Sequence, residues 1–452
     1  MGKLFGTDGV RGIANSELTC ERAMQIGRAA ASVLSEGRTQ PLTVLMGMDT
    51  RISSEMLAGA LSAGLCSAGV DVIDLGVIPT PAVAYLISKY QAHAGIMISA
   101  SHNPYEYNGI KIFNADGYKL EDALEGRIES IILDGKPGPR LAASGKIGRV
   151  IRTDRAATDY IDRLCSTVSL PLDGMRIAVD CANGAASRTA AALFGRLGAE
   201  CTVLHASPDG RNINDSCGST HPDALREYVT ANGLDAGAAF DGDADRCLMI
   251  DDRGEVVDGD MIMAMLALDM KARGRLNRDT VVGTIMTNFG FSKFCKDNGI
   301  GFVAARVGDR YVLEEMLRQD YSLGGEQSGH IILRDFAATG DGQLTAVQVL
   351  ALLRRTGMKL SDAAKAMTRC PQFTVNIPAS AEAKAAFETD HTIRRILEDA
   401  RAAIGNGGRL IARPSGTEPL IRIMAEGEDP EAIRAAAKDT AARIPKQLES
   451  YR

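Results

Sequence analysis

The sequence predicts an α/β protein of three related mixed α/β domains, each made of repeated βα units, followed by a smaller C-terminal α+β domain. The chain has 452 residues, which is too long for one ordinary globular domain. Its 47 glycines are spread between short apolar runs rather than gathered in a linker. This spacing is typical of alternating strands and helices. The same alternation of strands and helices recurs three times along the chain, although the amino-acid sequences of the three rounds are poorly similar to one another.

The alternation is clearest in the first domain, which we place at residues 1–150. An apolar run at 43–49 ends in polar residues and predicts a buried strand. The segments that follow are a helix at 54–70, a strand at 71–75, a helix at 82–90 and a strand at 94–99. This order of strands and helices predicts a mostly parallel sheet.

Two further rounds of the same kind predict a second domain at 151–256 and a third at 257–368. The elements of the second domain are strands at 176–180, 200–204 and 234–240, with helices at 187–197 and 221–231. Those of the third are strands at 280–286 and 301–305, with helices at 261–271, 292–297 and 311–318.

The last part of the chain, residues 369–452, differs from the three rounds. Its predicted elements are strands at 373–377 and 420–425 and helices at 384–403 and 430–443. This content is typical of a small α+β domain.

Composition and charge favour a soluble, cytoplasmic enzyme. The net charge of −6 leaves no cationic excess for a nucleic-acid partner. No apolar stretch approaches the ~20 residues that a membrane helix needs. The chain reaches an acidic residue at Asp8, too early for a signal peptide. The nine cysteines are scattered without a C-x-x-C pair, which indicates a reducing compartment rather than disulfides or a zinc site.

The strongest chemical signal is an acidic cluster after the last strand of the second domain. Asp241, Asp243 and Asp245 alternate, so in an extended segment their side chains would share a face. Three such carboxylates repel one another unless a cation joins them, and oxygen ligands suit Mg²⁺ or Ca²⁺. An EF-hand is excluded because its sixth and twelfth positions would be Arg246 and Asp252. We favour a Mg²⁺ site over a solvated acidic turn.

A serine follows the last strand of the first domain. The apolar run at 95–98 leads into a Ser-His-Asn-Pro turn, so Ser101 should be exposed at the carboxyl end of a strand, where α/β sheets bind ligands. A hydrolase nucleophile is disfavoured because the G-x-S-x-G pattern is missing and His102 is poorly placed as its base. Ser101 could instead carry a phosphoryl group, with Mg²⁺ on one of its oxygens, or simply cap an ordinary turn.

Further residues could bind phosphate. Lys111 could act as a general base or phosphate partner, or lie on the surface as a solvated lysine. The loop at 413–419 offers Arg413, two hydroxyls and a glycine that admits backbone N–H groups, so it could cradle a phosphate without a P-loop. Arg422 could add a second guanidinium. The plainer alternative is a turn of Pro and Gly residues that carries serine and threonine side chains without binding phosphate.

Two glycine-flanked polar loops complete the set. The loop at 324–330 carries Glu326, Ser328 and His330 with little bulk around them, which suits a carboxylate that spans two sugar hydroxyls. Near the N-terminus, Arg11 could reach a phosphate or belong to a simple turn. The motifs therefore predict a metal ion, a phosphorylatable serine, a sugar-binding carboxylate and a phosphate cradle. We expect the four domains to surround a central cleft that binds a phosphorylated polyol.

On these motifs the chain resembles the α-D-phosphohexomutases along essentially its whole length. The five motifs, in that family's order, are Gly-Thr-Asp-Gly-x-Arg-Gly at 6–12, Ser-His-Asn-Pro at 101–104, Asp-Gly-Asp-x-Asp-Arg at 241–246, Gly-Glu-x-Ser-Gly-His at 325–330 and Arg-Pro-Ser-Gly-Thr-Glu-Pro at 413–419. The opening segment 4–12, the loop 325–330 and the segment 307–312 make it most similar to bacterial members that act on glucosamine phosphates.

The resemblance implies a reaction and its cofactor. Glucosamine 6-phosphate and glucosamine 1-phosphate would be interconverted, feeding UDP-N-acetylglucosamine synthesis. Ser101 would first be phosphorylated, pass its phosphoryl group to the sugar, and regain the other phosphoryl group from a bisphosphate intermediate. One Mg²⁺ per subunit would be bound by Ser101, Asp241, Asp243 and Asp245.

The resemblance also implies roles for the remaining residues. The catalytic residues would be Ser101, His102, Lys111, Arg11 and Arg246. The substrate-binding residues would be Glu326, Ser328, His330, Arg413, Ser415, Gly416, Thr417 and Arg422. The expected partner is a small sugar phosphate, without nucleic acid or membrane, and a homodimer is plausible. The alternatives are a phosphoglucomutase or phosphomannomutase activity, and a non-catalytic sugar-phosphate sensor.

Overall fold

The computed structural model describes residues 4–6, 8–38, 41–134, 141–415 and 419–448. The contacts divide the chain into two compact units. The large unit comprises 1–286 and 300–366, and the small unit comprises 287–299 and 367–452. Within the described ranges, every helix is too short or too polar to cross a membrane.

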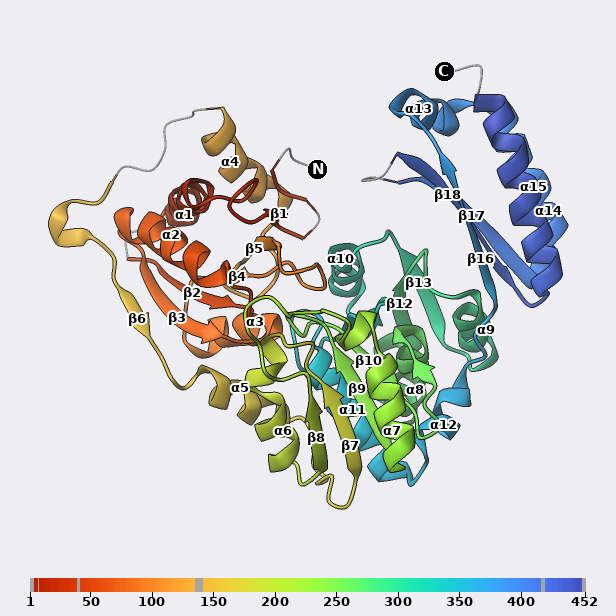
Figure 1. Cartoon of the computed structure of the whole chain (residues 1–452), viewed down its shortest axis with the longest axis horizontal. Helices are drawn as coiled ribbons and strands as arrows, with labels where there is room; N and C mark the ends of the chain where they lie inside the picture. Colours follow the sequence, from red (N-terminus) through yellow and green to blue (C-terminus); the bar gives the residue numbers. More distant parts are fainter. Residues whose placement is uncertain (1–3, 7, 39–40, 135–140, 416–418, 449–452) are drawn as a thin grey trace. The chain divides into compact units, whose positions relative to one another are not determined.

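The first sheet of the large unit has six strands (Figure 1). In spatial order they are β1 (Val10–Ile13), β5 (Tyr107–Phe113), β4 (Ala94–Ile98), β2 (Thr43–Met48), β3 (Asp71–Val77) and β6 (Val150–Arg152). The four strands β4, β2, β3 and β6 run parallel, whereas β5 is antiparallel to both of its neighbours. The helices of this part are α1 (Cys20–Ser35), α2 (Ser54–Ser67), α3 (Thr80–Lys89) and α4 (Asp122–Leu133).

The second sheet has five strands, three of them parallel. In spatial order they are β11 (Val256–Val257), β10 (Cys247–Ile250), β9 (Ala236–Phe240), β7 (Arg176–Asp180) and β8 (Glu200–Leu204). The antiparallel strand β10 returns directly from β9 through the acidic turn. The accompanying helices are α5 (Ala156–Cys165), α6 (Ala190–Arg196) and α7 (Asp223–Asn232).

The third sheet has four strands, of which the last is antiparallel. In spatial order they are β13 (Gly301–Ala305), β12 (Thr280–Thr284), β14 (Leu323–Gly325) and β15 (Ile331–Leu333). Its helices are α8 (Gly259–Ala272), α10 (Asp309–Gln319), α11 (Gly342–Thr356) and α12 (Leu360–Ala363). The predicted sugar loop connects β14 to β15.

The small unit has one antiparallel sheet, packed on helices. Its strands, in spatial order, are β16 (Gln372–Pro378), β18 (Leu420–Gly427) and β17 (Gly408–Pro414). Its helices are α9 (Phe289–Asp297), α13 (Ala381–Thr389), α14 (His391–Ile404) and α15 (Pro430–Leu448). Alternate apolar residues of the strands form its core with α14 and α15.

The predicted fold class is confirmed by the three mixed sheets and the separate α+β end of the chain. Two details differ. The predicted helix at 384–403 is two helices, because Asp390 ends α13 and its carboxylate caps α14 by accepting from Thr392 N and Ile393 N. The antiparallel strands at the sheet edges, such as β1 and β15, were not predicted because they are short and rich in glycine or polar neighbours. The three boundaries between the four predicted domains stay a prediction.

Close packing in the first domain depends on two glycines where α1 meets α2. A Cβ on Gly27 would lie 2.6 Å from Leu61 O, and one on Gly64 would lie 2.4 Å from Met24 O. Carbon and oxygen atoms do not approach so closely without a shift of the backbone. Glycine at both positions therefore lets the two helices pack together above the buried strands.

We expect Gly64→Ala to lower the free energy of unfolding by roughly 1–3 kcal/mol, the usual cost of overpacking a core. This loss should exceed the gain of ~1 kcal/mol in helix propensity. The matched control is Gly59→Ala in the same helix, where the added Cβ meets no atom within 4 Å. That variant should gain stability by about 0.5–1 kcal/mol. Urea unfolding measures both, and a similar change in the two variants would contradict the packing argument.

Candidate functional site

Ser101 lies in the loop that follows β4. Only 1% of its surface is exposed, so the prediction of an exposed serine is wrong. Its φ of 53° is a left-handed conformation that a residue with a side chain rarely adopts. Such a conformation persists only where the surrounding contacts hold it. The strand therefore delivers the serine into the interior of the large unit, in a fixed backbone conformation.

The buried hydroxyl reaches the acidic cluster. Ser101 Oγ donates a hydrogen bond to Asp241 Oδ2 at 2.6 Å. The Nδ1 atom of His102 lies 3.3 Å from the same Oγ, but the hydroxyl directs its one proton to Asp241, so the prediction that His102 is poorly placed as the base of Ser101 stays a prediction. Burial lowers the pKa of His102 to about 4, and the charges of Arg246 and Arg11 contribute to this shift. A neutral imidazole thus lies beside the hydroxyl at neutral pH.

The three aspartates of the cluster follow β9 in a turn. One carboxylate oxygen from each of Asp241, Asp243 and Asp245 lies within 4.8 Å of the others. The sequence predicted this convergence from an extended segment, but the structure achieves it differently. The backbone turns through Ala244, whose φ is 57°. The turn brings the carboxylates together, and all three side chains are buried.

The cluster fits a metal ion. Asp243 Oδ1 and Asp245 Oδ1 are buried and have no hydrogen-bond partner within the described part of the chain. Burial raises the pKa of Asp241 well above its usual value, and the carboxylates of Asp245 and Asp243 raise it further. A bound cation would give the two oxygens a partner and would favour the charged form of Asp241. A set of carboxylate oxygens is suited to a hard divalent ion.

Lys111, on β5, contacts the cluster directly. Its side chain is 1% exposed, and Nζ donates to Asp243 Oδ2 at 2.9 Å and lies 3.6 Å from Asp245 Oδ2. Nζ also lies 3.2 Å from Asp8 Oδ2. Burial alone would lower the pKa of Lys111, but the Asp243, Asp8 and Asp245 carboxylates raise it above its ordinary value. The alternative of a solvated surface lysine is therefore wrong, and the ammonium keeps its proton.

Two arginines add positive charge at the border of the cluster. Arg246 N donates to Asp241 Oδ1 at 3.2 Å, and Arg246 Nε lies 3.9 Å from Asp245 Oδ1. Arg11, on β1, forms an ion pair with Asp8. The Nε atoms of both arginines are buried without a hydrogen-bond partner among the described residues. Each guanidinium therefore keeps a donor that an anionic ligand could use.

The predicted sugar loop lies next to the same cluster. His330 is buried, with Nδ1 3.6 Å from Asp245 Oδ2. Gly340 N donates to His330 Nε2 at 3.2 Å, so the ring proton is on Nδ1 and faces the aspartate. Glu326 Oε1 accepts from Gly308 N at 3.1 Å. His330 therefore lies beside the carboxylates. Among the described residues, no hydrogen-bond donor contacts the second oxygen of Glu326, which could bind another partner.

Further residues contact this group that were not predicted from the sequence. Arg51 and Asn214 both donate to the backbone carbonyl of Ser101, each at 2.9 Å. Thr80, the first residue of α3, donates from Oγ1 to Asp243 Oδ2 at 2.5 Å. The position of Arg51 just beyond the predicted strand at 43–49 was a usable signal. Asn214 lies in a long loop that shows no such pattern.

The predicted phosphate cradle belongs to the small unit. Arg413 on β17 and Arg422 on β18 are direct cross-strand partners, so their side chains share one face of the sheet. Ser415 ends the described part of this loop, and its carbonyl accepts from a lysine Nζ at 2.8 Å. Gly416 and Thr417 lie outside the described residues.

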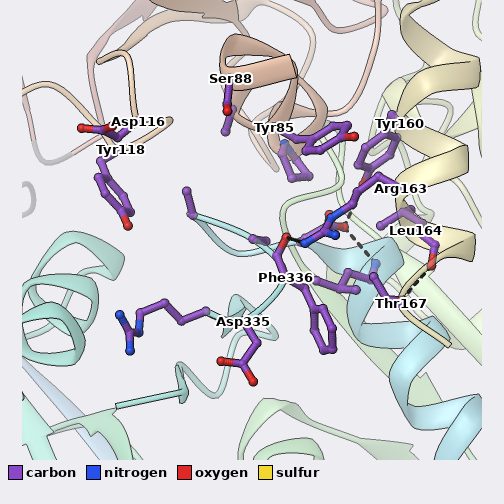
Figure 2. A pocket seen from close by; sticks show the side chains of 17 residues that line it. Tyr85, Ser88, Asp116, Tyr118, Tyr160, Arg163, Leu164, Thr167, Asp335 and Phe336 are labelled. Carbon is purple, nitrogen blue, oxygen red and sulfur yellow. Dashed lines mark hydrogen bonds between the residues drawn. The ribbon is translucent and has the colours of Figure 1, made fainter. Parts of the chain in front are cut away.

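A separate pocket of about 250 Å³ lies between α3, α5 and the segment before α11 (Figure 2). The guanidinium of Arg163 lies 5.8 Å from the ring centre of Tyr85 and donates to Phe336 O at 2.9 Å. None of the predicted site residues lines this pocket. It is therefore distinct from the site around Ser101.

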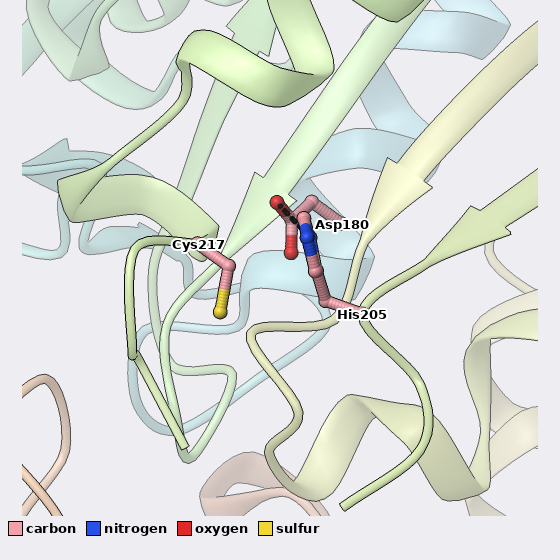
Figure 3. A group of neighbouring side chains, drawn as sticks. All are labelled: Asp180, His205 and Cys217. Atoms are coloured by element: carbon pink, nitrogen blue, oxygen red, sulfur yellow. Dashed lines mark hydrogen bonds and ion pairs between the residues drawn. The ribbon is translucent and has the colours of Figure 1, made fainter. Parts of the chain in front are cut away.

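A second group of potential ligand atoms lies at the carboxyl ends of β7 and β8 (Figure 3). It consists of Asp180, His205 and Cys217. Asp180 already accepts from His205 Nδ1 at 2.9 Å, from Gly218 N at 3.0 Å and from Ala182 N at 2.8 Å. These three donors account for the buried carboxylate, and the group anchors the loops that leave the two strands.

Comparison with known proteins places the chain among phosphohexose mutases. Family models for the α/β/α domains I, II and III and the C-terminal domain of phosphoglucomutase/phosphomannomutase match residues 2–137, 158–254, 258–370 and 367–443. The X-ray structure of a family protein from Burkholderia thailandensis has a TM-score of 0.80 at 23% identity, covering 99% of this chain and 98% of that one. A putative phosphomannomutase from Thermus thermophilus has a TM-score of 0.76 at 22% identity, covering 98% of each chain. These two structures share the fold.

The curated relatives are much more similar. The chain is 49% identical to a phosphoglucosamine mutase from Clostridium novyi, over 98% of this chain and 99% of the relative. It is 51% identical to a phosphoglucosamine mutase from Caldanaerobacter subterraneus, over 99% of this chain and all of the relative. The chain therefore belongs to the phosphoglucomutase/phosphomannomutase family and, within it, to the phosphoglucosamine mutases.

Proposed function

We propose that this enzyme interconverts glucosamine 6-phosphate and glucosamine 1-phosphate through a phosphorylated Ser101. The observation that carries the proposal is the hydrogen bond from Ser101 Oγ to Asp241 Oδ2, which joins the serine to the acidic cluster. Relatives about half identical over nearly the whole chain support the choice of substrate. A sugar-phosphate sensor would need neither an acceptor serine nor three buried carboxylates beside it.

Mg²⁺ is the ion we propose for the cluster, held by Asp241, Asp243, Asp245 and an oxygen on Ser101. The donor set consists of oxygens only, which Mg²⁺ prefers. When bound, Mg²⁺ supplies positive charge that offsets the repulsion between a phosphoserine and a dianionic sugar phosphate.

The proposed reaction consists of two phosphoryl transfers. In the first, the bond between phosphorus and Ser101 Oγ breaks while a bond forms to the free hydroxyl of the sugar phosphate, and the proton lost by that hydroxyl is balanced by one taken up at Ser101 Oγ. The bisphosphate then turns over. The bond between its other phosphorus and the sugar oxygen breaks as Ser101 Oγ is phosphorylated again, and Ser101 Oγ loses its proton while the sugar oxygen gains one. Such transfers need in-line positioning and charge stabilisation more than covalent chemistry from the protein.

Lys111, Arg11 and Arg246 provide that charge from the chain itself. Because Lys111 Nζ is buried and donates to Asp243 Oδ2 at 2.9 Å, we assign it charge stabilisation. The Nε atoms of Arg11 and Arg246, which have no hydrogen-bond acceptor in the described part of the chain, suit the oxygens of the transferring group. His102, 3.3 Å from Ser101 Oγ, would orient that oxygen.

The remaining groups would hold the sugar and its second phosphate. We assign Glu326 to two hydroxyls that exchange places nearly symmetrically when the sugar turns over, with Ser328 and His330 beside it. The buried Ser328 Oγ has no partner among the described residues and keeps its hydrogen-bonding capacity. The groups proposed for the phosphate that is not reacting are Arg413, Ser415, Gly416, Thr417 and Arg422.

The substrate assignment predicts that kcat/KM is highest for glucosamine 6-phosphate when glucose 6-phosphate and mannose 6-phosphate are assayed beside it. The three sugars test the same phosphoryl-transfer machinery and differ only at carbon 2, which carries an amino group in glucosamine and hydroxyls of opposite configuration in glucose and mannose. A higher kcat/KM for either neutral sugar would refute glucosamine specificity while leaving the phosphoserine mechanism in place.

The phosphoserine assignment predicts that Ser101→Ala abolishes turnover, because the variant has no acceptor oxygen, while sugar-phosphate binding stays largely intact. Steady-state kinetics and calorimetry measure the two properties separately. Mass spectrometry should find phosphate on Ser101 of the purified wild-type protein. The matched control, Ser16→Ala at an exposed loop serine, should behave as the wild type. Activity of Ser101→Ala near that of the control would disprove the role.

A further inference from the structure

Arg51 lies just beyond the end of β2, and its side chain is completely buried. A guanidinium carries five N–H donors, and burial is costly unless each of them finds an acceptor. The described contacts satisfy all five. They run from Nε to Asp49 Oδ2 at 2.8 Å, from Nη2 to Ser101 O at 2.9 Å and Asn103 O at 2.8 Å, and from Nη1 to Tyr107 O at 3.0 Å and to Pro104 O.

Three of these acceptors are backbone carbonyls of the loop that carries Ser101, and a fourth is the carbonyl of Tyr107, the first residue of β5. Arg51 therefore binds the backbone of this particular loop, and its side chain does more than pack in the core. Its ionic partner, Asp49, acts on the same loop by another route. Asp49 Oδ2 accepts from Ser99 Oγ at 2.7 Å, and Ser99 Oγ in turn accepts from Ser101 N at 2.9 Å. Both backbone polar groups of Ser101 are thus fixed by a connected buried network.

Asn214 holds the same carbonyls from a different part of the chain. Its Nδ2 donates to Ser101 O at 2.9 Å and to Asn103 O at 3.1 Å. Asn214 belongs to the loop between β8 and α7, so the second sheet of the large unit contributes this contact. The carbonyl oxygens of Ser101 and Asn103 therefore each accept one hydrogen bond from Arg51 and one from Asn214.

The loop needs such restraint because of its backbone conformation. Ser101 has a positive φ, which is unfavourable for serine unless neighbouring contacts enforce it. The direction of its side chain, and hence the 2.6 Å contact with Asp241, depends on that backbone. In group-transfer reactions a misplacement of about 1 Å can cost ~100-fold in rate.

We propose that Arg51 is a positioning residue for phosphoryl transfer, with Asn214 as its counterpart. The two side chains clamp the carbonyl oxygens of Ser101 and Asn103, and this clamp aims the Ser101 oxygen at the carboxylate cluster. Neither side chain contacts the reacting phosphoryl group. The inference rests on the proposed role of Ser101 and adds to it the groups that set its direction.

Arg51→Lys tests the clamp because it retains a positive charge for Asp49 but has only three donors and no planar fork. We expect kcat to fall by ~100-fold, as for a misplaced reacting group, with KM changed by no more than about twofold. Hydrogen exchange should rise in segment 99–108. The matched control is Arg226→Lys, since Arg226 Nε also donates to a backbone carbonyl, Gly254 O, at 2.7 Å in a different loop. Its kcat should match the wild type.

Asn214→Ala is the second variant and decides the question if Arg51→Lys does not fold. It removes two hydrogen bonds but no charge, so we expect a fall in kcat of roughly tenfold. Wild-type kcat and wild-type exchange at 99–108 in either folded variant would overturn the proposal. So would a lower melting temperature with unchanged kcat, because that indicates a purely structural role.

The exchange measurement separates this proposal from the proposed function. It reports the order of the loop without any turnover, and all variants are assayed with the same three hexose phosphates. A wild type that prefers a neutral sugar would refute the glucosamine assignment, while the comparison of variants would still decide the role of Arg51.

Discussion

Three buried carboxylates in one turn are the constraint on which the site of the large unit depends. Because the three side chains are buried, their mutual repulsion must be offset by neighbouring groups. Lys111 and Thr80 do so from the first domain, and His330 does so from the third. Because the carboxylates follow a strand of the second sheet while the compensating groups come from the regions of the first and third, the charge balance also ties the three regions together. The serine hydroxyl enters the same network through Asp241.

The sequence was sufficient for the fold class and for the main chemical groups. Apolar runs of strand length separated by helical spacing identify a buried parallel sheet, because its strands are hydrophobic on both faces. The strand at 236–240 leads directly into the acidic turn, so clustered carboxylates could be predicted from the sequence. The match of five motifs to one family added the reaction, which composition and periodicity alone do not specify.

The burial and orientation of individual side chains could not be predicted. Ser101 and Lys111 were judged from their own neighbours in the sequence, but their burial depends on segments more than 100 residues away. The turn through Ala244 was missed because alanine gives no signal for a left-handed backbone. Asn214 was missed for a related reason: it donates to backbone carbonyls, and a carbonyl acceptor cannot be recognised from the sequence of the loop that provides it. Arg51 also donates to these carbonyls, and only its position beyond the predicted strand at 43–49 could have indicated it.

The central claim is that a phosphate on Ser101 and the three carboxylates bind one and the same metal ion. The most direct test is the ³¹P NMR signal of the phosphorylated enzyme with Mn²⁺ in place of Mg²⁺. Because paramagnetic relaxation falls steeply with distance, the phosphoserine signal should broaden beyond detection and return when EDTA removes the ion. A sharp phosphoserine signal with one Mn²⁺ bound per chain would contradict the account.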